Sequence, residues 1–252
     1  FSAMFGTVES VTYEMPNNSD YILSQYDVVA GQYPEATSEN EFVLVLNNDG
    51  GMTDIVMAQL GLLSMDEVLE LFQKDEEGEE DITYVPYEEL LAHRYIYYPN
   101  DSIYIQSAMP SMGMQRLWQK TGYYDPNANL TMNKKNGTEI KIGCILRAKE
   151  STVYGSLASG LAYMPGFTQK YLTDSRASKI VQETDGKQRV YSMDFGSVIE
   201  AMMSGDYSKM KYTFEDLTIR ELGGAEMPNE IRIYVKDFDH KDAVTAHLDR
   251  WN

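Results

Sequence analysis

The stretch Thr138-Glu-Ile-Lys-Ile-Gly-Cys-Ile-Leu-Arg147 carries the clearest strand pattern in the chain. Successive side chains of a strand point to opposite faces of a sheet, so every second residue shares a face. One face would carry Ile140, Ile142, Cys144 and Leu146. The other face would carry Lys141, Gly143, Ile145 and Arg147. We therefore predict a paired strand buried on its first face, and the preceding Asn136-Gly137 pair is typical of a hairpin turn.

Apolar patterns on both sides of this stretch predict the remaining elements. Further strands are expected at residues 8–15, 25–29, 41–46, 95–98, 103–106 and 230–236. Helices are expected at residues 54–60, 64–72, 87–92, 167–172, 175–184, 195–203, 214–222 and 240–251, the last of them amphipathic. Residues 109–133 read as irregular. Strands therefore come early and at the end while helices concentrate late, which is typical of an α+β fold rather than strict βαβ alternation.

Length, composition and charge limit the class of protein. The chain has 252 residues, enough for one large domain or two small ones, and 43% of them are hydrophobic. The formal net charge of −18 disfavours nucleic acid and anionic membrane surfaces as partners, because like charges repel. Cys144 is the only cysteine, so the chain can form no internal disulfide. No run of about 18 apolar residues is present, so no segment is predicted to span a bilayer.

The sequence offers no convergent set of catalytic side chains. None of its three histidines is matched by a serine in a nucleophile-elbow pattern. Cys144 falls on the apolar face of the predicted strand, which suits an inert core thiol rather than a nucleophile. We therefore expect no catalytic residue, no cofactor and no enzymatic activity.

Two motifs are similar to metal sites. Residues 47–54 are similar to a calcium loop, but Ala58 stands where such a loop needs a bidentate glutamate. A glycine turn that leads into a helix is the favoured interpretation. Met112 and Met114 have a spacing that suits Cu(I), but no histidine or cysteine stands beside them in the sequence, so a flexible docking loop is favoured. We expect no bound metal.

Four segments, taken in order, resemble one known family. They are Tyr21-Ile-Leu-Ser-Gln-Tyr-Asp-Val-Val-Ala-Gly-Gln-Tyr-Pro-Glu35, Asn40-Glu-Phe-Val-Leu-Val-Leu46 with residues 54–62 behind it, Glu139-Ile-Lys-Ile-Gly-Cys-Ile-Leu-Arg147, and Ile231-Arg-Ile-Tyr-Val-Lys-Asp-Phe-Asp-His-Lys-Asp242. Together they are similar to the extracytoplasmic domain of FtsX-like/MacB-like ABC transporter permeases, in the form common in Firmicutes. Cys144 stands where the family has an aliphatic residue, and Ala148 and Val235 stand where it has prolines.

The resemblance implies a two-lobed α+β fold, the MacB-like periplasmic core domain. Residues 1–20 and 165–252 would form a porter-like α/β lobe that is incomplete at its N-terminus. Residues 21–164 would form an inserted, mainly β lobe similar to the Sabre part. The chain would cross between the lobes near Tyr21 and near Pro165-Gly166, and this Pro-Gly pair beside a Gly/Ser loop suits a hinge. Because the chain starts at Phe1 and stops directly after the last predicted helix, we expect a domain cut from a longer protein.

The resemblance also implies a function and a location. Such domains lie on the extracellular face of the bacterial cytoplasmic membrane, between the first two transmembrane helices of the permease. This one would couple the motion of a cytosolic ATPase to an extracellular partner or substrate, in mechanotransmission or export. Its expected partners are the transmembrane helices of the same permease, the cytosolic ABC ATPase indirectly, and an extracellular protein, peptide or lipid-like substrate.

Tyrosines and methionines of the middle segment are the predicted partner contacts, because amphipathic aromatic and flexible thioether side chains suit protein interfaces. These residues are Tyr97, Tyr98, Tyr104, Met112, Met114 and Tyr123. The alternative function is a freestanding extracellular protein that binds a peptide or glycan through the tyrosine-rich residues 95–104 and 123–124. Membrane helices flanking this segment in its gene, beside an ATPase gene, would favour the permease. A signal peptide and a wall anchor would favour the alternative.

Overall fold

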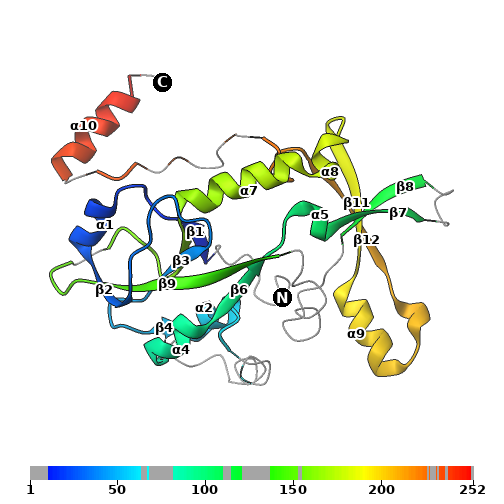
Figure 1. The fold of residues 1–252 in the computed structure, drawn as a ribbon, viewed down its shortest axis with the longest axis horizontal. Helices are drawn as coiled ribbons and strands as arrows, with labels where there is room; N and C mark the ends of the chain where they lie inside the picture. The colour runs from blue at the N-terminus through cyan, green and yellow to red at the C-terminus, as the bar shows by residue number, and fades with distance from the viewer. Residues whose placement is uncertain are drawn as a thin grey trace.

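The computed structural model describes residues 11–63, 67, 82–109, 115–120, 137–152, 155–225, 227, 231, 233–235 and 238–250. The described part is a mixed α/β structure with two main sheets (Figure 1). The helix α7 (Pro165–Ala177) runs between the two sheets. The α+β class predicted from the order of elements agrees with this architecture.

The larger sheet has six strands in the order β1-β10-β3-β9-β2, and β6 also pairs with β9. Its strands are β1 (Thr12–Glu14), β2 (Tyr26–Gly31), β3 (Glu41–Val45), β6 (Arg94–Tyr97), β9 (Thr138–Ala148) and β10 (Gly160–Tyr163). The pairs β1·β10 and β3·β9 are parallel, and the others are antiparallel. The apolar strand predicted at residues 41–46 is therefore central, as its composition indicated.

The smaller sheet has four strands in the order β12-β11-β8-β7. Its strands are β7 (Tyr104–Met109), β8 (Gln115–Lys120), β11 (Lys187–Met193) and β12 (Tyr212–Thr218). The pair β8·β11 is parallel, whereas β7·β8 and β11·β12 are antiparallel. Two short strands, β4 (Met52–Thr53) and β5 (Ile82–Thr83), form a separate ribbon.

Short helices connect the strands, and local capping signals set their ends. The helices are α1 (Ser19–Gln25), α2 (Asp54–Gln59), α4 (Tyr87–Ala92), α5 (Asn100–Ile103), α7, α8 (Lys179–Gln182), α9 (Phe195–Ser204), the 3-10 helix η3 (Tyr207–Lys209) and α10 (Phe238–Leu248). The Thr53 side chain accepts a hydrogen bond from the Val56 N–H at the start of α2. Gly61, with φ of +68°, follows the end of α2, as predicted.

A bulge in β9 changes which residues share a face. Phe42 of β3 lies opposite Ile142, but Val43 lies opposite Cys144, so β9 inserts Gly143 as one extra residue. The bulge interrupts the strict alternation that the sequence pattern assumed.

The consequence is that both faces of β9 are buried. Ile140, Ile142, Cys144 and Leu146 are all buried, as predicted. They do not share a face, however, because Ile140 and Ile142 join one core cluster while Cys144 and Leu146 join another. Ile145, expected on the open face, is fully buried as well. The prediction of a strand buried on one side was therefore wrong.

Three clusters of apolar side chains form the core. The first packs one face of the six-stranded sheet against α2 and α4, with Phe42, Leu44, Met57, Leu90 and Ile145 among its members. The second packs the opposite face against α1 and includes Met15, Ile22, Tyr26, Val43 and Cys144. The third belongs to the four-stranded sheet and α8, and it contains Trp118, Ile180, Val181, Val190 and Leu222.

Several predicted elements differ in the structure. Residues 214–222, expected as a helix, mostly form β12, because hairpin pairing with β11 outweighs a weak local helical spacing. The strand β8 lies in the stretch expected to be irregular, and β11 was not anticipated. Residues 231 and 233–235 form no strand, and Ile231 and Ile233 are 78% and 54% exposed. The last helix is present, but its described side chains are mostly exposed rather than buried along one face.

Strand pairing also crosses both predicted lobe boundaries. β1, from residues 1–20, pairs with β10, which lies in residues 21–164. β8, also from residues 21–164, pairs with β11, which lies in residues 165–252. Each predicted boundary therefore falls between paired strands of one sheet, and the division into two lobes remains a prediction.

Helix length bears on membrane insertion. Within the described ranges, we find no helix with the length and apolar character needed to cross a bilayer.

Candidate functional site

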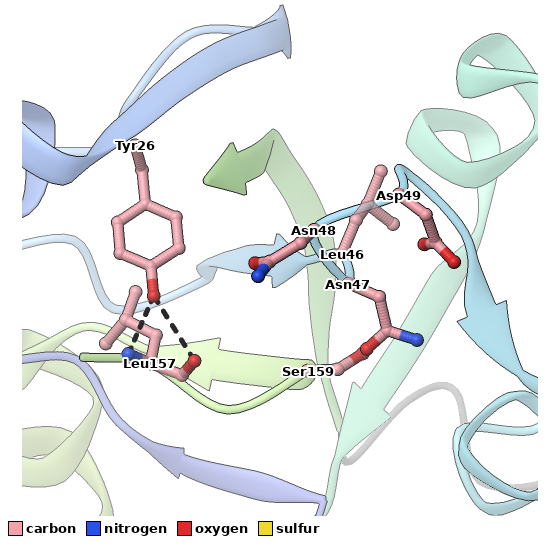
Figure 2. A pocket seen from close by; sticks show the side chains of 7 residues that line it. All are labelled: Tyr26, Leu46, Asn47, Asn48, Asp49, Leu157 and Ser159. Carbon is pink, nitrogen blue, oxygen red and sulfur yellow. Dashed lines mark hydrogen bonds between the residues drawn. The ribbon is translucent and has the colours of Figure 1, made fainter. Parts of the chain in front are cut away.

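A polar pocket lies where the turn after β3 meets the loop before β10 (Figure 2). Its volume is about 460 Å³. The lining residues are Tyr26, Leu46, Asn47, Asn48, Asp49, Leu157 and Ser159. The antiparallel pairing of β10 with β3 places these two loops together, because Gly160 lies opposite Val45.

Tyr26 fixes the wall formed by the loop before β10. Its hydroxyl accepts a hydrogen bond from the Leu157 N–H at 2.8 Å and lies 3.2 Å from the Leu157 carbonyl, to which it donates (Figure 2). Burial raises the pKa of Tyr26, so this hydroxyl keeps its proton at neutral pH. A β-carbon at Gly155 would overlap the Tyr26 hydroxyl, which explains a glycine at this position.

The preceding residue, Gln25, holds the same loop to α1. Its carbonyl accepts hydrogen bonds from the Lys149 N–H at 2.9 Å and from the Thr152 hydroxyl at 3.1 Å. Its side-chain oxygen accepts a third, from the Ser156 N–H at 3.1 Å. This wall of the pocket is therefore pre-formed rather than shaped by a ligand.

A glycine turn forms the opposite wall. The Asn47 N–H donates to the Gly51 carbonyl, and the Asp49 side chain accepts from the Gly51 N–H at 3.0 Å. Gly50 has φ of +88°, a conformation that suits glycine. The turn leads directly into the Thr53 cap of α2, so the predicted glycine turn that leads into a helix is confirmed.

The pocket offers hydrogen bonds and little charge. The side-chain amides of Asn47 and Asn48 have no hydrogen-bond partner among the described residues, and each can donate and accept. The Ser159 hydroxyl donates to the Val45 carbonyl at 3.2 Å and can still accept. Figure 2 shows the Asp49 carboxylate pointing away from Tyr26 and Asn48. Such a lining suits neutral ligand groups, such as amides or hydroxyls.

The predicted partner contacts that the structure describes are packed side chains. Tyr97 stacks edge-on against Phe167 at 5.2 Å, and burial raises its pKa. Tyr104 packs on the third cluster, and burial raises its pKa too. Tyr98 is partly buried. Met112, Met114 and Tyr123 lie outside the described residues, so their predicted role remains a prediction.

The predicted hinge pair lies at the start of α7. Pro165 is the first residue of this helix, a position that suits proline because the missing N–H has no helical partner there. The Gly166 N–H donates to the Ala36 carbonyl at 2.8 Å. A β-carbon at Gly166 would overlap the Thr37 carbonyl, so this glycine permits close packing. Its role as a hinge remains a prediction.

Cys144 and the possible metal ligands bear on nucleophile and metal chemistry. Cys144 is fully buried, and burial raises its pKa to about 12, so its thiol is neutral and shielded. Over the described ranges, no three His, Cys, Asp or Glu side chains converge as metal ligands.

Comparison with known proteins found no matching family model, no matching curated protein and no matching solved structure. The pocket was not predicted from the sequence either. Its two walls are about 100 residues apart in the chain, and no local signal in either loop indicates that β3 and β10 pair.

Proposed function

We propose that this chain is the extracellular domain of an ABC transporter permease, which transmits the motion of a cytosolic ATPase to an extracellular partner or substrate. The proposal rests on the four segments that resemble FtsX-like/MacB-like permeases. It includes a location on the outer face of the bacterial cytoplasmic membrane and the two-lobed core-domain fold.

One observation carries the proposal. Three of the four resembling segments contain β2, β3 and β9, and the β9 segment lies far along the chain from the other two. These strands are neighbours in the order β3-β9-β2, which ends at one edge of the six-stranded sheet. Their adjacency supports a shared fold.

The helix α7 supports a mechanical role. Its 13 residues span about 20 Å at 1.5 Å per residue. Near its first turn, Phe167 packs against Phe42 of the six-stranded sheet at 4.9 Å. Near its last turn, Ser175 is fully buried and lies close to Gly223, beside the third cluster. A helix anchored at both ends can pass a displacement from one sheet to the other.

The alternative, a freestanding binding protein, would use the tyrosine-rich residues 95–104 and 123–124, of which the structure describes the first group. Tyr97 packs against α7, and Tyr95 and Tyr97 also pack on the first core cluster. Tyr104 packs on the third cluster. A surface of this kind does not favour the alternative.

The reading frame around this segment gives the first test. Membrane helices on both sides of it, with an ATPase gene adjacent, are expected. A frame with a signal peptide and no membrane helix would overturn the proposal.

A second test softens α7 in the full-length permease. Gln169 and Thr173 are exposed, so replacing both by glycine leaves the packed face intact. Glycine weakens the helix by about 1 kcal/mol per residue relative to alanine. The matched control replaces both by alanine, which loses the same bond from the Thr173 hydroxyl to the Gln169 carbonyl. We expect reduced transport for the glycine pair, normal transport for the alanine pair, and equal ATPase assembly. Equal transport by both pairs would contradict a force-bearing α7.

A further inference from the structure

The outer strand of the four-stranded sheet, β12, is an open edge. β12 is the first strand in the order β12-β11-β8-β7, so it has one strand neighbour within the described residues. All five residues from Tyr212 to Asp216 are exposed. Its pairing with β11 is regular over seven residues, with no bulge. Exposed regular edges are pairing sites that proteins usually protect.

The register identifies the backbone groups that point outward. The Asp194 N–H donates to the Lys211 carbonyl at 2.8 Å, just beyond the pair Met193↔Tyr212. In an antiparallel ladder this makes Met193↔Tyr212 a pair without mutual hydrogen bonds, and such pairs recur at every second position. The N–H and C=O groups of Tyr212, Phe214 and Asp216 therefore point away from β11.

Both ends of this open edge are closed by local bonds. At one end, the Met210 N–H donates to the Tyr207 carbonyl at 3.3 Å. At the other end, the Thr218 N–H donates to the Glu221 carboxylate at 2.8 Å, and the Thr218 carbonyl accepts from the Leu222 N–H. Three consecutive outward-facing residues remain between these ends. They are enough for a short added strand.

Edges of the six-stranded sheet are blunted by comparison. β1 has three residues, and the register of β2 shifts between Val28 and Ala30. Short strands and bulges both discourage further pairing. β12 is longer than β1 and, unlike β2, pairs without a register shift, so its edge is more open to further pairing.

The side chains on this edge define what could pair with it. Tyr212 and Phe214 are 48% and 40% exposed, and both rings pack against Tyr191 on the same face. The exposed Asp216 follows on that face, and it forms no ion pair with a described residue. Its cross-strand neighbour Arg189 lies over the Phe214 ring instead, at 5.5 Å. The edge thus presents two apolar positions and then an unpaired carboxylate.

We propose that β12 binds an extended peptide segment by strand addition. In the antiparallel orientation the segment places a lysine or arginine opposite Asp216 and apolar side chains opposite Phe214 and Tyr212. Its main chain bonds to the three outward-facing residues, and its alternate side chains determine specificity. This inference is independent of the proposed transport function.

A second copy of the chain is a weaker occupant. In a two-fold pairing centred on Phe214, Asp216 would face Tyr212 of the other copy and would gain no cation. Each copy also carries a net charge of −18, so two copies repel each other. A segment with a basic residue supplies a cation opposite Asp216 and is attracted to the negatively charged chain, whereas a second copy does neither.

The experiment uses the peptide Thr-Lys-Thr-Val-Thr-Val-Thr with blocked ends, titrated into the isotopically labelled chain and followed by NMR. We expect shift changes and slowed hydrogen exchange at the amides of Tyr212, Phe214 and Asp216. Amides of Thr213 and Glu215 already bond to β11 and should show little added protection. A peptide N-methylated at both valines should fail to bind, because it lacks the required donors.

A charge exchange tests the specificity. Asp216→Lys should weaken binding of this peptide about two- to fivefold and strengthen binding of the version with Glu in place of Lys by a similar factor. The position is exposed, so the variant should fold, as checked by its spectrum without peptide. Equal affinities for both peptides in both proteins would overturn the proposal. So would shift changes confined to another edge, or concentration-dependent dimerisation through the same amides without peptide.

Discussion

Replacing Cys144 by aspartate tests whether the second face of β9 is closed to water. The thiol is fully buried between Val43 and Leu146 of the second cluster. A carboxylate there would have no cation, and the charge of Glu41 already helps to raise the pKa of the thiol, after burial. An uncompensated buried charge costs about 3–5 kcal/mol. This is a large share of the 5–15 kcal/mol that usually stabilises a domain.

The pH dependence separates charge from shape. Burial raises the pKa of the introduced carboxyl above its unfolded value of about 3.9. Below that value the carboxyl is neutral in both states, and the penalty grows as pH rises toward the folded pKa. Cys144→Asp should therefore lose more stability at pH 7 than at pH 4. Cys144→Asn, which has the same shape and no charge, should lose a similar amount at both.

Urea unfolding followed by the fluorescence of the buried Trp118 measures both variants. Each loss is taken relative to the unchanged chain at the same pH. If Cys144→Asp does not fold at pH 7 but folds at pH 4, this difference also shows that the buried charge destabilises the fold. Equal losses for the Asp and Asn variants at both pH values would refute the idea that this face excludes water.

The structure predicts the sign of the stability change for three further substitutions, and urea unfolding measures each. Tyr26→Phe leaves a loop N–H without its acceptor and should cost about 1–3 kcal/mol; no loss would show that the pocket wall is held otherwise. Gly166→Ala should destabilise, although glycine to alanine in a helix usually gains about 1 kcal/mol; its control Gly196→Ala has room for the methyl group and should not. Lys141→Met removes the hydrogen bond that lowers the pKa of Glu41, a stabilisation present at neutral pH and lost as pH falls through the carboxyl pKa. Because the pair is partly exposed, the loss in stability should stay below about 1 kcal/mol and should vanish once the pH falls below the lowered pKa of Glu41.

Local signals in the sequence predicted those parts of the fold that local physics decides. The apolar run at residues 41–46 and the Thr53 cap of α2 can each be recognised from neighbouring residues alone. The bulge at Gly143 could not be found this way, because it follows from how β3 and β9 pair. β12 was misassigned for the same reason, since its strand is stabilised by β11.

The candidate site was harder to predict than the fold. The Asn47–Gly51 turn was recognised as a turn, but its role as a pocket wall depends on a loop about 100 residues later. The tyrosines at 97 and 104 show a second difficulty. A tyrosine suits both an interface and a core edge, so its presence does not tell which of the two it occupies.

The parallel pairing of β1 with β10 constrains the order in which this chain can fold. Thr12 of β1 pairs with Leu161, so the first strand waits for roughly 150 more residues before its neighbour exists. At ribosomal rates of 5–20 residues per second, that interval is about 7–30 s. Throughout this interval the start of the chain has no native strand partner. Cells that make this protein must therefore keep its early segment from aggregating during synthesis, a demand that a fold built from local hairpins would avoid.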